Sequence, residues 1–337
     1  MGSEIVKRLL FLPVTLFFVA TLVFLALRAL PGSSIELLGS QFTTAGLKEQ
    51  LIAELGLDRP MLEQYWIFLK ELLRFDLGRS FLTGKDVGTM VAETLPITIE
   101  LAVASLIVMS IVGIGMGLLA GAFPGTFLDG SLRAVAVLLF SLPWFWFGIV
   151  LIIVFSLWLG WLPPFGRLPS IIDYEAVTNF VLIDAVILGR PDLIGPWLMH
   201  LTLPALTVGL TTSGVVMRLT RVGVIETART DYVRTARMKG VPVRRIFFRH
   251  ILRNASLGIL TVIGVQFGAM LGGSVIAEVV FGYPGIGRMT VDAVLNRDYA
   301  AAQGGAIVIA ALYVLINLAT DLSYRWADPR LRRGAGK

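Results

Sequence analysis

The sequence predicts an all-α polytopic membrane protein, and three observations carry that prediction. The 337 residues have a mean hydropathy of +0.80, and only 15% are charged, against about 25% in soluble domains. Six stretches without Asp, Glu, Lys or Arg have about the 20 residues that a transmembrane helix needs. Basic residues gather in the segments that separate alternate stretches, as they do in multi-pass membrane proteins.

The six apolar stretches are the expected transmembrane helices: Leu9–Leu27, Leu101–Gly121, Ala134–Trp161, Leu201–Met217, Ala255–Ala277 and Ala300–Thr320. The first follows Lys7 and Arg8, as the core of a signal peptide would. Its apolar core is too long for a signal peptide, and no clean small-x-small cleavage site follows. We therefore expect a retained membrane anchor.

The distribution of Lys and Arg predicts the orientation. With the amino terminus inside, the inner segments are 1–8, 122–133, 218–254 and 321–337. They carry 18 of the 29 Lys and Arg residues, although the outer segments are much longer. This asymmetry satisfies the positive-inside rule, so both termini are expected in the cytoplasm.

Two outer segments are long enough to hold structure of their own. Residues 31–93 show helical periodicity at Leu47, Leu51 and Leu55, and again at Leu62, Trp66, Leu69 and Leu73, which predicts two helices in a small external subdomain. Residues 162–199 contain the apolar stretch Ala176–Leu188, which is interrupted by Asp184. That stretch is too short to span a bilayer, so an interfacial or re-entrant helix is expected.

The inner segment between the fourth and fifth stretches has a helical hairpin pattern. Thr227–Met238 is expected to be helical, with Gly240 as its C-terminal cap and Pro242 starting a second helix. On that second helix Val243, Phe247 and Ile251 share one face, and Arg245, Arg249 and Arg253 lie roughly opposite. An apolar ridge of this kind suits either a groove in a partner protein or the surface of an anionic membrane.

This segment carries a family resemblance. Arg234-Thr-Ala-Arg-Met-Lys-Gly240 resembles the EAA-x3-G loop of ABC importer permeases, and Asp231–Asn254 is similar to the dipeptide and oligopeptide branch. Other stretches of that branch follow the same order: Gly56-Leu-Asp-Arg-Pro60, Asp76-Leu-Gly-Arg-Ser80, Ala277-Glu-Val-Val-Phe-Gly-Tyr-Pro-Gly-Ile-Gly287, Asn296-Arg-Asp-Tyr299 and Asp328-Pro-Arg330. The general pattern has Glu where this chain has Arg234, and Pro where it has Arg253, so no role is carried over for those two residue types.

The resemblance implies a type I ABC importer permease core at residues 94–324, preceded by an N-terminal helix and external segment at 1–93 and followed by a cytoplasmic tail at 325–337. It implies a location in the bacterial cytoplasmic membrane. It also implies that the loop 221–254 contains a coupling helix that sits in a groove of a cytoplasmic ATPase subunit. By position, the contacting residues would be Asp231, Tyr232, Arg234, Ala236, Arg237, Lys239, Gly240 and Val241.

The expected partners follow from the same resemblance. They are a second homologous permease, two ATPase subunits, an external substrate-binding protein and membrane lipid. No G-x-x-x-x-G-K-[ST] phosphate loop occurs in the chain, so we expect no ATPase activity and no cofactor in it; ATP and Mg would bind the partners. There are also no cysteines and only two histidines, which leave little material for a metal site.

Two further groups of residues invite a structural or a functional interpretation. The first group is two G-x-x-x-G-x-x-x-G ridges, which consist of Gly113, Gly117 and Gly121 and of Gly264, Gly268 and Gly272. Such ridges let helix backbones approach closely, so tight packing is favoured over a lining of the translocation path. At the outer end of the fifth stretch, Glu278, Tyr283 and Pro284 would form either an ordinary solvated helix end or a contact near an outer gate or with a binding protein.

The leading hypothesis is a permease for di- or oligopeptides, with nickel or glutathione-like solutes as alternatives within the family. A self-sufficient channel or secondary carrier is a different class, which inverted repeats and charged broken helices near the midplane would indicate. Neither pattern is found. Nucleic-acid binding is prompted only by the ten Lys and Arg residues between Arg218 and Arg253, and no recognition motif surrounds them.

Overall fold

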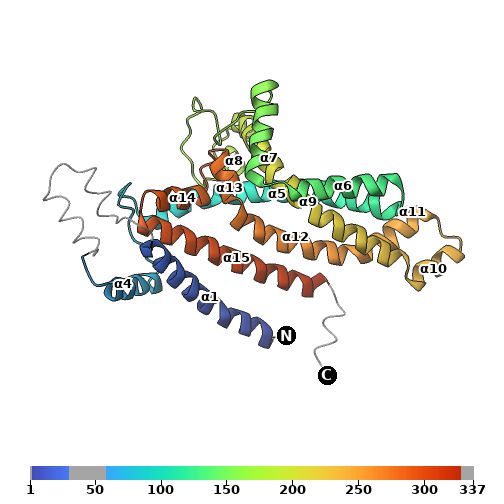
Figure 1. Cartoon of the computed structure of the whole chain (residues 1–337), viewed down its shortest axis with the longest axis horizontal. Helices are drawn as coiled ribbons and strands as arrows, with labels where there is room; N and C mark the ends of the chain where they lie inside the picture. Colours follow the sequence, from blue (N-terminus) through green and yellow to red (C-terminus); the bar gives the residue numbers. More distant parts are fainter. Residues whose placement is uncertain (1, 30–57, 328–337) are drawn as a thin grey trace. The chain divides into compact units, whose positions relative to one another are not determined.

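The computed structural model describes residues 2–29 and 58–327, which are helical with no β-strand among them (Figure 1). The chain divides into two compact units. Of the described residues, the small unit contains 2–29, 58–97 and 284–311, and the large unit contains 98–283 and 312–327. In this division the late segment 284–311 belongs with the N-terminal region, and the domain boundary expected at residue 93 stays a prediction. The long helices α5 (Val87–Ala122) and α15 (Tyr299–Ala327) contribute to both units.

Five of the six expected transmembrane segments appear as helices long and apolar enough to span, if bent pairs are counted as one. Three do so singly, at Val87–Ala122, Pro191–Ala228 and Tyr299–Thr320, and two do so as bent pairs. The sixth lies in α1 (Gly2–Ala29), whose apolar part Pro13–Ala29 is too short to count as a span in the same way. The count of six therefore stays a prediction.

In the small unit, α1 packs against α4 (Met61–Leu73). Phe24 makes ring contacts with Tyr65 and Phe68, and the Thr21 and Tyr65 hydroxyls are 2.7 Å apart. The expected helix at Leu62–Leu73 is thus present, and Leu62, Trp66 and Leu73 are exposed rather than packed on α1. The contacts with α1 come from the neighbouring face. The expected first helix, at Leu47–Leu55, falls outside the described residues.

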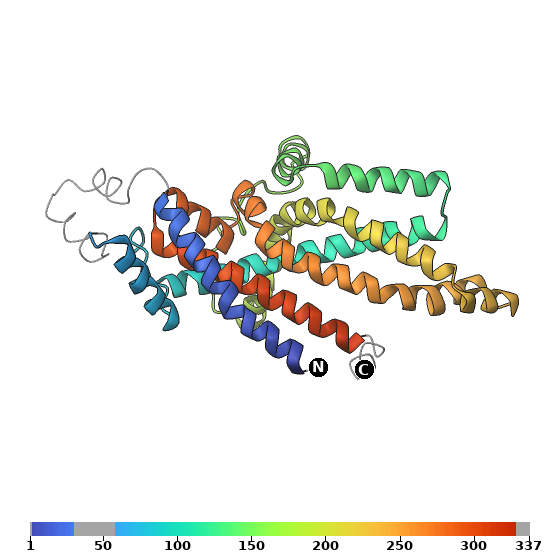
Figure 2. The ribbon, with the colours of Figure 1, turned by 60° about the horizontal axis from the view of Figure 1, so that its bottom comes forward.

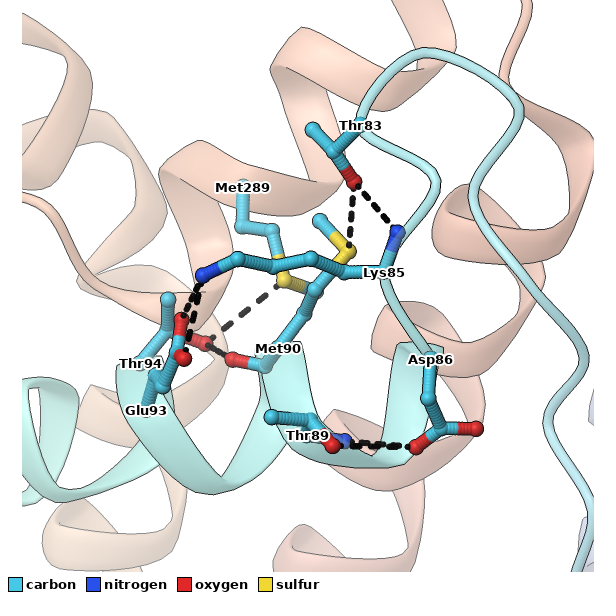
Figure 3. A network of polar contacts seen from close by, with 8 residues as sticks. All are labelled: Thr83, Lys85, Asp86, Thr89, Met90, Glu93, Thr94 and Met289. Carbon is cyan, nitrogen blue, oxygen red and sulfur yellow. Dashed lines mark hydrogen bonds and ion pairs between the residues drawn. The ribbon is translucent and has the colours of Figure 1, made fainter.

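The rest of the small unit joins the start of α5 to α14 (Ile286–Leu295) and the first half of α15. Its core contains Val87, Val91, Ile286, Ala301 and Ala302. Figure 3 shows the polar contacts at the start of α5: Asp86 caps the helix by accepting from the Thr89 amide at 2.8 Å, and Lys85 pairs with Glu93 at 3.0 Å. Because Lys85 and Glu93 are both exposed, this pair adds little stability.

In the large unit, α9 (Ile194–Ala228) is the central helix and supplies more of the buried residues than any other described helix. Figures 1 and 2 show α6 (Phe127–Ser141) and α12 (Arg253–Gly273) running beside it. Short elements complete the unit: α7 (Trp144–Leu151), the π-helix η1 (Ile152–Trp158), α8 (Val181–Ile187), the 3-10 turn η2 (Pro191–Leu193) and α13 (Val275–Val280). The turn between α5 and α6 and the loop after α9 lie at the same end of this unit, as the predicted orientation requires (Figure 2).

The expected continuous span Ala134–Trp161 is wrong. The chain bends by 103° between α6 and α7–η1. Pro143 explains the break, because its ring excludes the preceding residue from the helical region, and Leu142 accordingly has ψ 129°. In the segment 162–199, the short helix α8 lies inside the expected interfacial stretch Ala176–Leu188 and is shorter than it.

Candidate functional site

The loop after α9 folds as a hairpin with a glycine elbow. Its first helix is α10 (Asp231–Met238), and Gly240 adopts φ +71°, the left-handed conformation that glycine adopts without strain. The Val241 amide donates to the Ala236 carbonyl at 3.2 Å and the Gly240 amide to that of Arg237 at 3.0 Å. These two bonds form a Schellman motif, so the elbow is a defined turn rather than a flexible linker.

Two local expectations for the hairpin need correction. The helix expected over Thr227–Met238 is interrupted, because α9 ends at Ala228 and Thr230 is extended before α10 begins. After α11 (Val243–Arg245), the second arm continues as the π-helix η3 (Ile246–Leu252). The π-helix has a wider turn, so it changes which residues share a face.

The inner face of the hairpin packs on the helical bundle. Val233, Ile246 and Ile251 are buried in one cluster with Val224 of α9 and Ala255 of α12, and Ala236 and Val241 of the elbow lie half-buried against it. The amide of Asn254 donates to the Tyr232 hydroxyl at 2.8 Å, joining the first arm to the start of α12. Of the expected apolar ridge, only Val243 is fully available, at 81% exposed, because Ile251 is buried and Phe247 is partly buried. These contacts with α9 and α12 fix the hairpin to the rest of the large unit.

The outer face of the hairpin is basic with an apolar tip. Residues 231–254 contain seven Lys or Arg residues and only one acidic residue, Asp231. The side chains of Met238 and Val243, on either side of the Gly240 elbow, are 73% and 81% exposed. A Cβ built at Gly240 would meet no atom within 4 Å. This face offers positive charge and two apolar contacts around an unobstructed turn.

A buried polar cluster lies at the opposite end of the large unit. Glu278 of α13 is 0% exposed, and its carboxylate accepts from the Thr98 hydroxyl at 2.7 Å and from Ser274 at 3.3 Å. The interpretation of Glu278 as a solvated helix end is therefore wrong. Tyr283 is also fully buried, and burial raises the pKa of its hydroxyl, which keeps the phenol neutral. Pro284 is exposed. In this conformation only Pro284 of the three offers a surface to a partner.

Sequence reasoning missed a second carboxylate beside Thr98. Glu100 of α5 accepts from Arg167 at 2.7 Å, from the Val181 amide at 2.6 Å and from Trp197 at 3.2 Å. Arg167 is itself buried and also donates to the Asn179 carbonyl at 2.6 Å. This cluster fastens the segment 167–181 to α5 and α9. The only available signal was a lone Glu just before an apolar stretch, which does not reveal a partner 67 residues away.

The glycine ridges lie at helix contacts. A Cβ on Gly113, Gly117 or Gly121 would come within 2.9 Å of α9 atoms, so α5 and α9 approach too closely there for a larger side chain. On α12, Gly264 faces Thr320 and Gly268 faces Asn317 of α15, whereas a Cβ at Gly272 would meet nothing within 4 Å. Five of the six glycines thus stand at close contacts within the large unit.

Two family models match the sequence. One describes the inner membrane component of binding-protein-dependent transport systems and covers residues 113–333; the other describes the N-terminal part of such membrane components and covers residues 1–102. The chain belongs to this family. Its members are inner membrane components of transport systems. Family membership and the apolar helices together show that the chain is a multi-pass protein of the bacterial inner membrane.

This chain matches named relatives over nearly its full length. It is 37% identical over 333 residues to a di/tripeptide transport system permease protein, DppB, of Pseudomonas aeruginosa, covering 98% of this chain and 99% of the relative. It is 35% identical over 332 residues to the dipeptide transport system permease protein DppB of Escherichia coli K12, covering 97% and 98%.

A solved structure shares the fold. A chain of the MetNI methionine ABC transporter, in an inward-facing conformation, superposes with a TM-score of 0.52 at 16% identity, covering 71% of this chain and 96% of that chain. At this identity the likeness concerns the fold alone. With the family match, it shows that the chain has the type I fold of ABC transporter permeases, as the resemblance implied.

Proposed function

We propose that this chain is a permease subunit of an ATP-driven importer for di- or oligopeptides. The names of its relatives support the peptide substrate, because the similarity extends over 97–98% of the chain. On this proposal the chain forms half of a translocation path and a second homologous permease forms the other half. Two cytoplasmic ATPase subunits drive the path between its inner-open and outer-open states, and an external binding protein delivers the solute.

The observation that carries the coupling part of the proposal is the exposed elbow of the hairpin. Its inner face is fixed to α9 and α12, while its tip presents Met238, Val243 and the open side of Gly240. A rigid tip with free apolar side chains suits the helix-in-groove mode of binding. The eight residues named for this role from the sequence lie on α10 or at the elbow. ATP and Mg would bind the ATPase subunits, since no phosphate loop occurs in this chain.

Replacing Gly240 with valine is expected to abolish solute uptake and to reduce co-purification of the ATPase subunits. The chain itself leaves room for the side chain, so the local cost is only the left-handed strain of about 1–2 kcal/mol. Any larger effect must come from a surface that covers the elbow. The measurement is uptake of a radiolabelled dipeptide into cells, with tag pull-down of the ATPases.

Gly189 provides a matched control for backbone strain. It also has a left-handed conformation, at φ +62°, and open space around its Cβ position, but it lies in the turn after α8 on the predicted outer side. Gly189→Val should impose the same strain and leave ATPase binding intact. If the two variants showed the same uptake and the same co-purification of the ATPase subunits, or if Gly240→Val showed normal uptake, docking at the elbow would be contradicted.

Reconstitution separates this proposal from its alternatives. Purified chain alone in liposomes should give no solute flux, because the path needs a second permease and an ATPase; flux without them would favour a channel or secondary carrier. With all partners present, competition between a labelled dipeptide and unlabelled glutathione or a nickel chelate decides the solute class.

A further inference from the structure

The turn between α5 and α6 is tied to α9 by a buried ion pair. The Asp129 side chain is 1% exposed, and both of its oxygens accept from Arg221 of α9 at 2.7 Å in a bidentate arrangement. The Gly125 amide donates to the same carboxylate at 2.9 Å. Such planar two-bond pairing fixes direction as well as distance, which a Lys in place of Arg cannot do.

Arg221 lies close to the hairpin along α9. It is seven residues, about 10 Å, before the end of that helix at Ala228. Val224, on the next turn, belongs to the cluster that buries Val233 and Ile246 of the hairpin. A continuous chain of contacts therefore runs from the hairpin through Val224 and Arg221 to Asp129 at the start of α6.

The glycines of α5 let α5 and α9 pack closely in this region. Gly121 faces Val224 and Gly117 faces Thr220, so the Cβ atoms of α9 rest against the α5 backbone on both sides of Arg221. Besides the Asp129–Arg221 pair, α6 meets these two helices through close packing: Ala136 and Leu132 pack with Ala120, Met116 and Met217, and the Ala136 carbonyl lies against Gly214 of α9. Packing of this kind carries no directional bond, so the ion pair adds a contact that fixes the register of α6 along α9.

We infer that the Asp129–Arg221 pair is a positioning strut that makes α6 move with α9 when the hairpin is displaced. This inference rests on the proposed coupling role of the hairpin. The strut carries the displacement into α6, and so to the 103° bend where α7 begins. Both residues act through the helices that they join and touch neither solute nor nucleotide.

Asp129→Asn, in the importer assembled with its second permease, ATPases and binding protein, tests the strut. In proteoliposomes the uptake of a radiolabelled dipeptide per ATP hydrolysed should fall about five- to ten-fold, the lower end of the usual range of coupling energies, while the subunits still co-purify. Arg221→Lys should give the same direction of change. Arg133→Gln is the matched control, because Arg133 lies 3.4 Å from the same carboxylate but is 56% exposed. This variant should leave the uptake per ATP hydrolysed unchanged.

A cross-link distinguishes a strut from a pair that only stabilises the fold. The chain has no cysteine, so Asp129→Cys combined with Arg221→Cys creates a unique pair in it. The reduced double variant should be uncoupled, and bridging the two thiols with a short bismaleimide should restore the ratio. Unchanged coupling in Asp129→Asn, no restoration after complete bridging, or loss of coupling only with loss of assembly would each overturn the strut. Absence of ATP-dependent dipeptide uptake by the wild-type assembly would instead overturn the proposed function.

Discussion

Replacing Gly117 with valine is expected to prevent the large unit from packing. A Cβ at this position would lie 2.5 Å from the Thr220 Cβ and 2.7 Å from the Met217 carbonyl oxygen. The carbonyl belongs to the backbone of α9 and cannot rotate away, so the two helices must separate. Overpacking usually costs about 1–3 kcal/mol and occasionally more, and a backbone carbonyl that cannot give way places this change at the upper end of that range. We expect a large fall in the thermal unfolding midpoint in detergent and little protein accumulated in the membrane.

Gly115 provides the control on the same helix. A Cβ there would meet nothing within 4 Å, so Gly115→Val makes the same chemical change without the contact. Its effect should reflect helix propensity alone, a few tenths of a kcal/mol in favour of valine. If Gly115→Val and Gly117→Val unfold at the same temperature, α5 and α9 do not meet at the ridge.

Replacing Glu100 with alanine is expected to destabilise the large unit by at least as much. The change leaves Arg167, only 9% exposed, without its carboxylate, and it also leaves the Val181 amide and the Trp197 indole without an acceptor. Removing one partner of a buried ion pair costs about 3–5 kcal/mol. The free energy of unfolding should fall by that amount, and the segment 167–181 should become sensitive to protease.

Two further variants identify the source of that loss. Glu93→Ala removes another glutamate of α5, but its pair with Lys85 is exposed, so the expected cost is below about 1 kcal/mol (Figure 3). Combining Glu100→Ala with Arg167→Leu should recover part of the stability, because no buried charge is then left unpaired. A double variant less stable than Glu100→Ala would show that the charge of Arg167 is satisfied elsewhere.

The features that were predictable from the sequence have local causes. The apolar stretches locate the long helices because the bilayer sets a length, and the Schellman elbow follows from a Gly between a basic helix and Pro242. The helix at Leu62–Leu73 was likewise visible in its periodicity. Each of these features depends on residues within one or two turns of each other.

The errors arose where a local pattern leaves two outcomes open. Pro143 inside the apolar stretch permits either a kinked span or a sharp turn, and packing selects the 103° bend. The expected faces of the second hairpin arm assumed α-helical geometry throughout, whereas the chain forms a π-helix in which Ile246 and Ile251 are buried. The apolar pattern of α4 identified a helix but not the face that meets α1.

The sequence by itself determined the class of the protein, its helices, its expected orientation and the glycine elbow, because hydropathy, charge and turn chemistry act over a few residues. Only the tertiary structure decided the partners of Glu100, Asp129 and Glu278, which lie 67, 92 and 180 residues away from the side chains that they bind. From the sequence alone, a charged residue near the end of an apolar stretch is expected to be solvated, and only the packing of the fold shows that it is buried. Burial then requires a partner, and the fold rather than the local sequence supplies one.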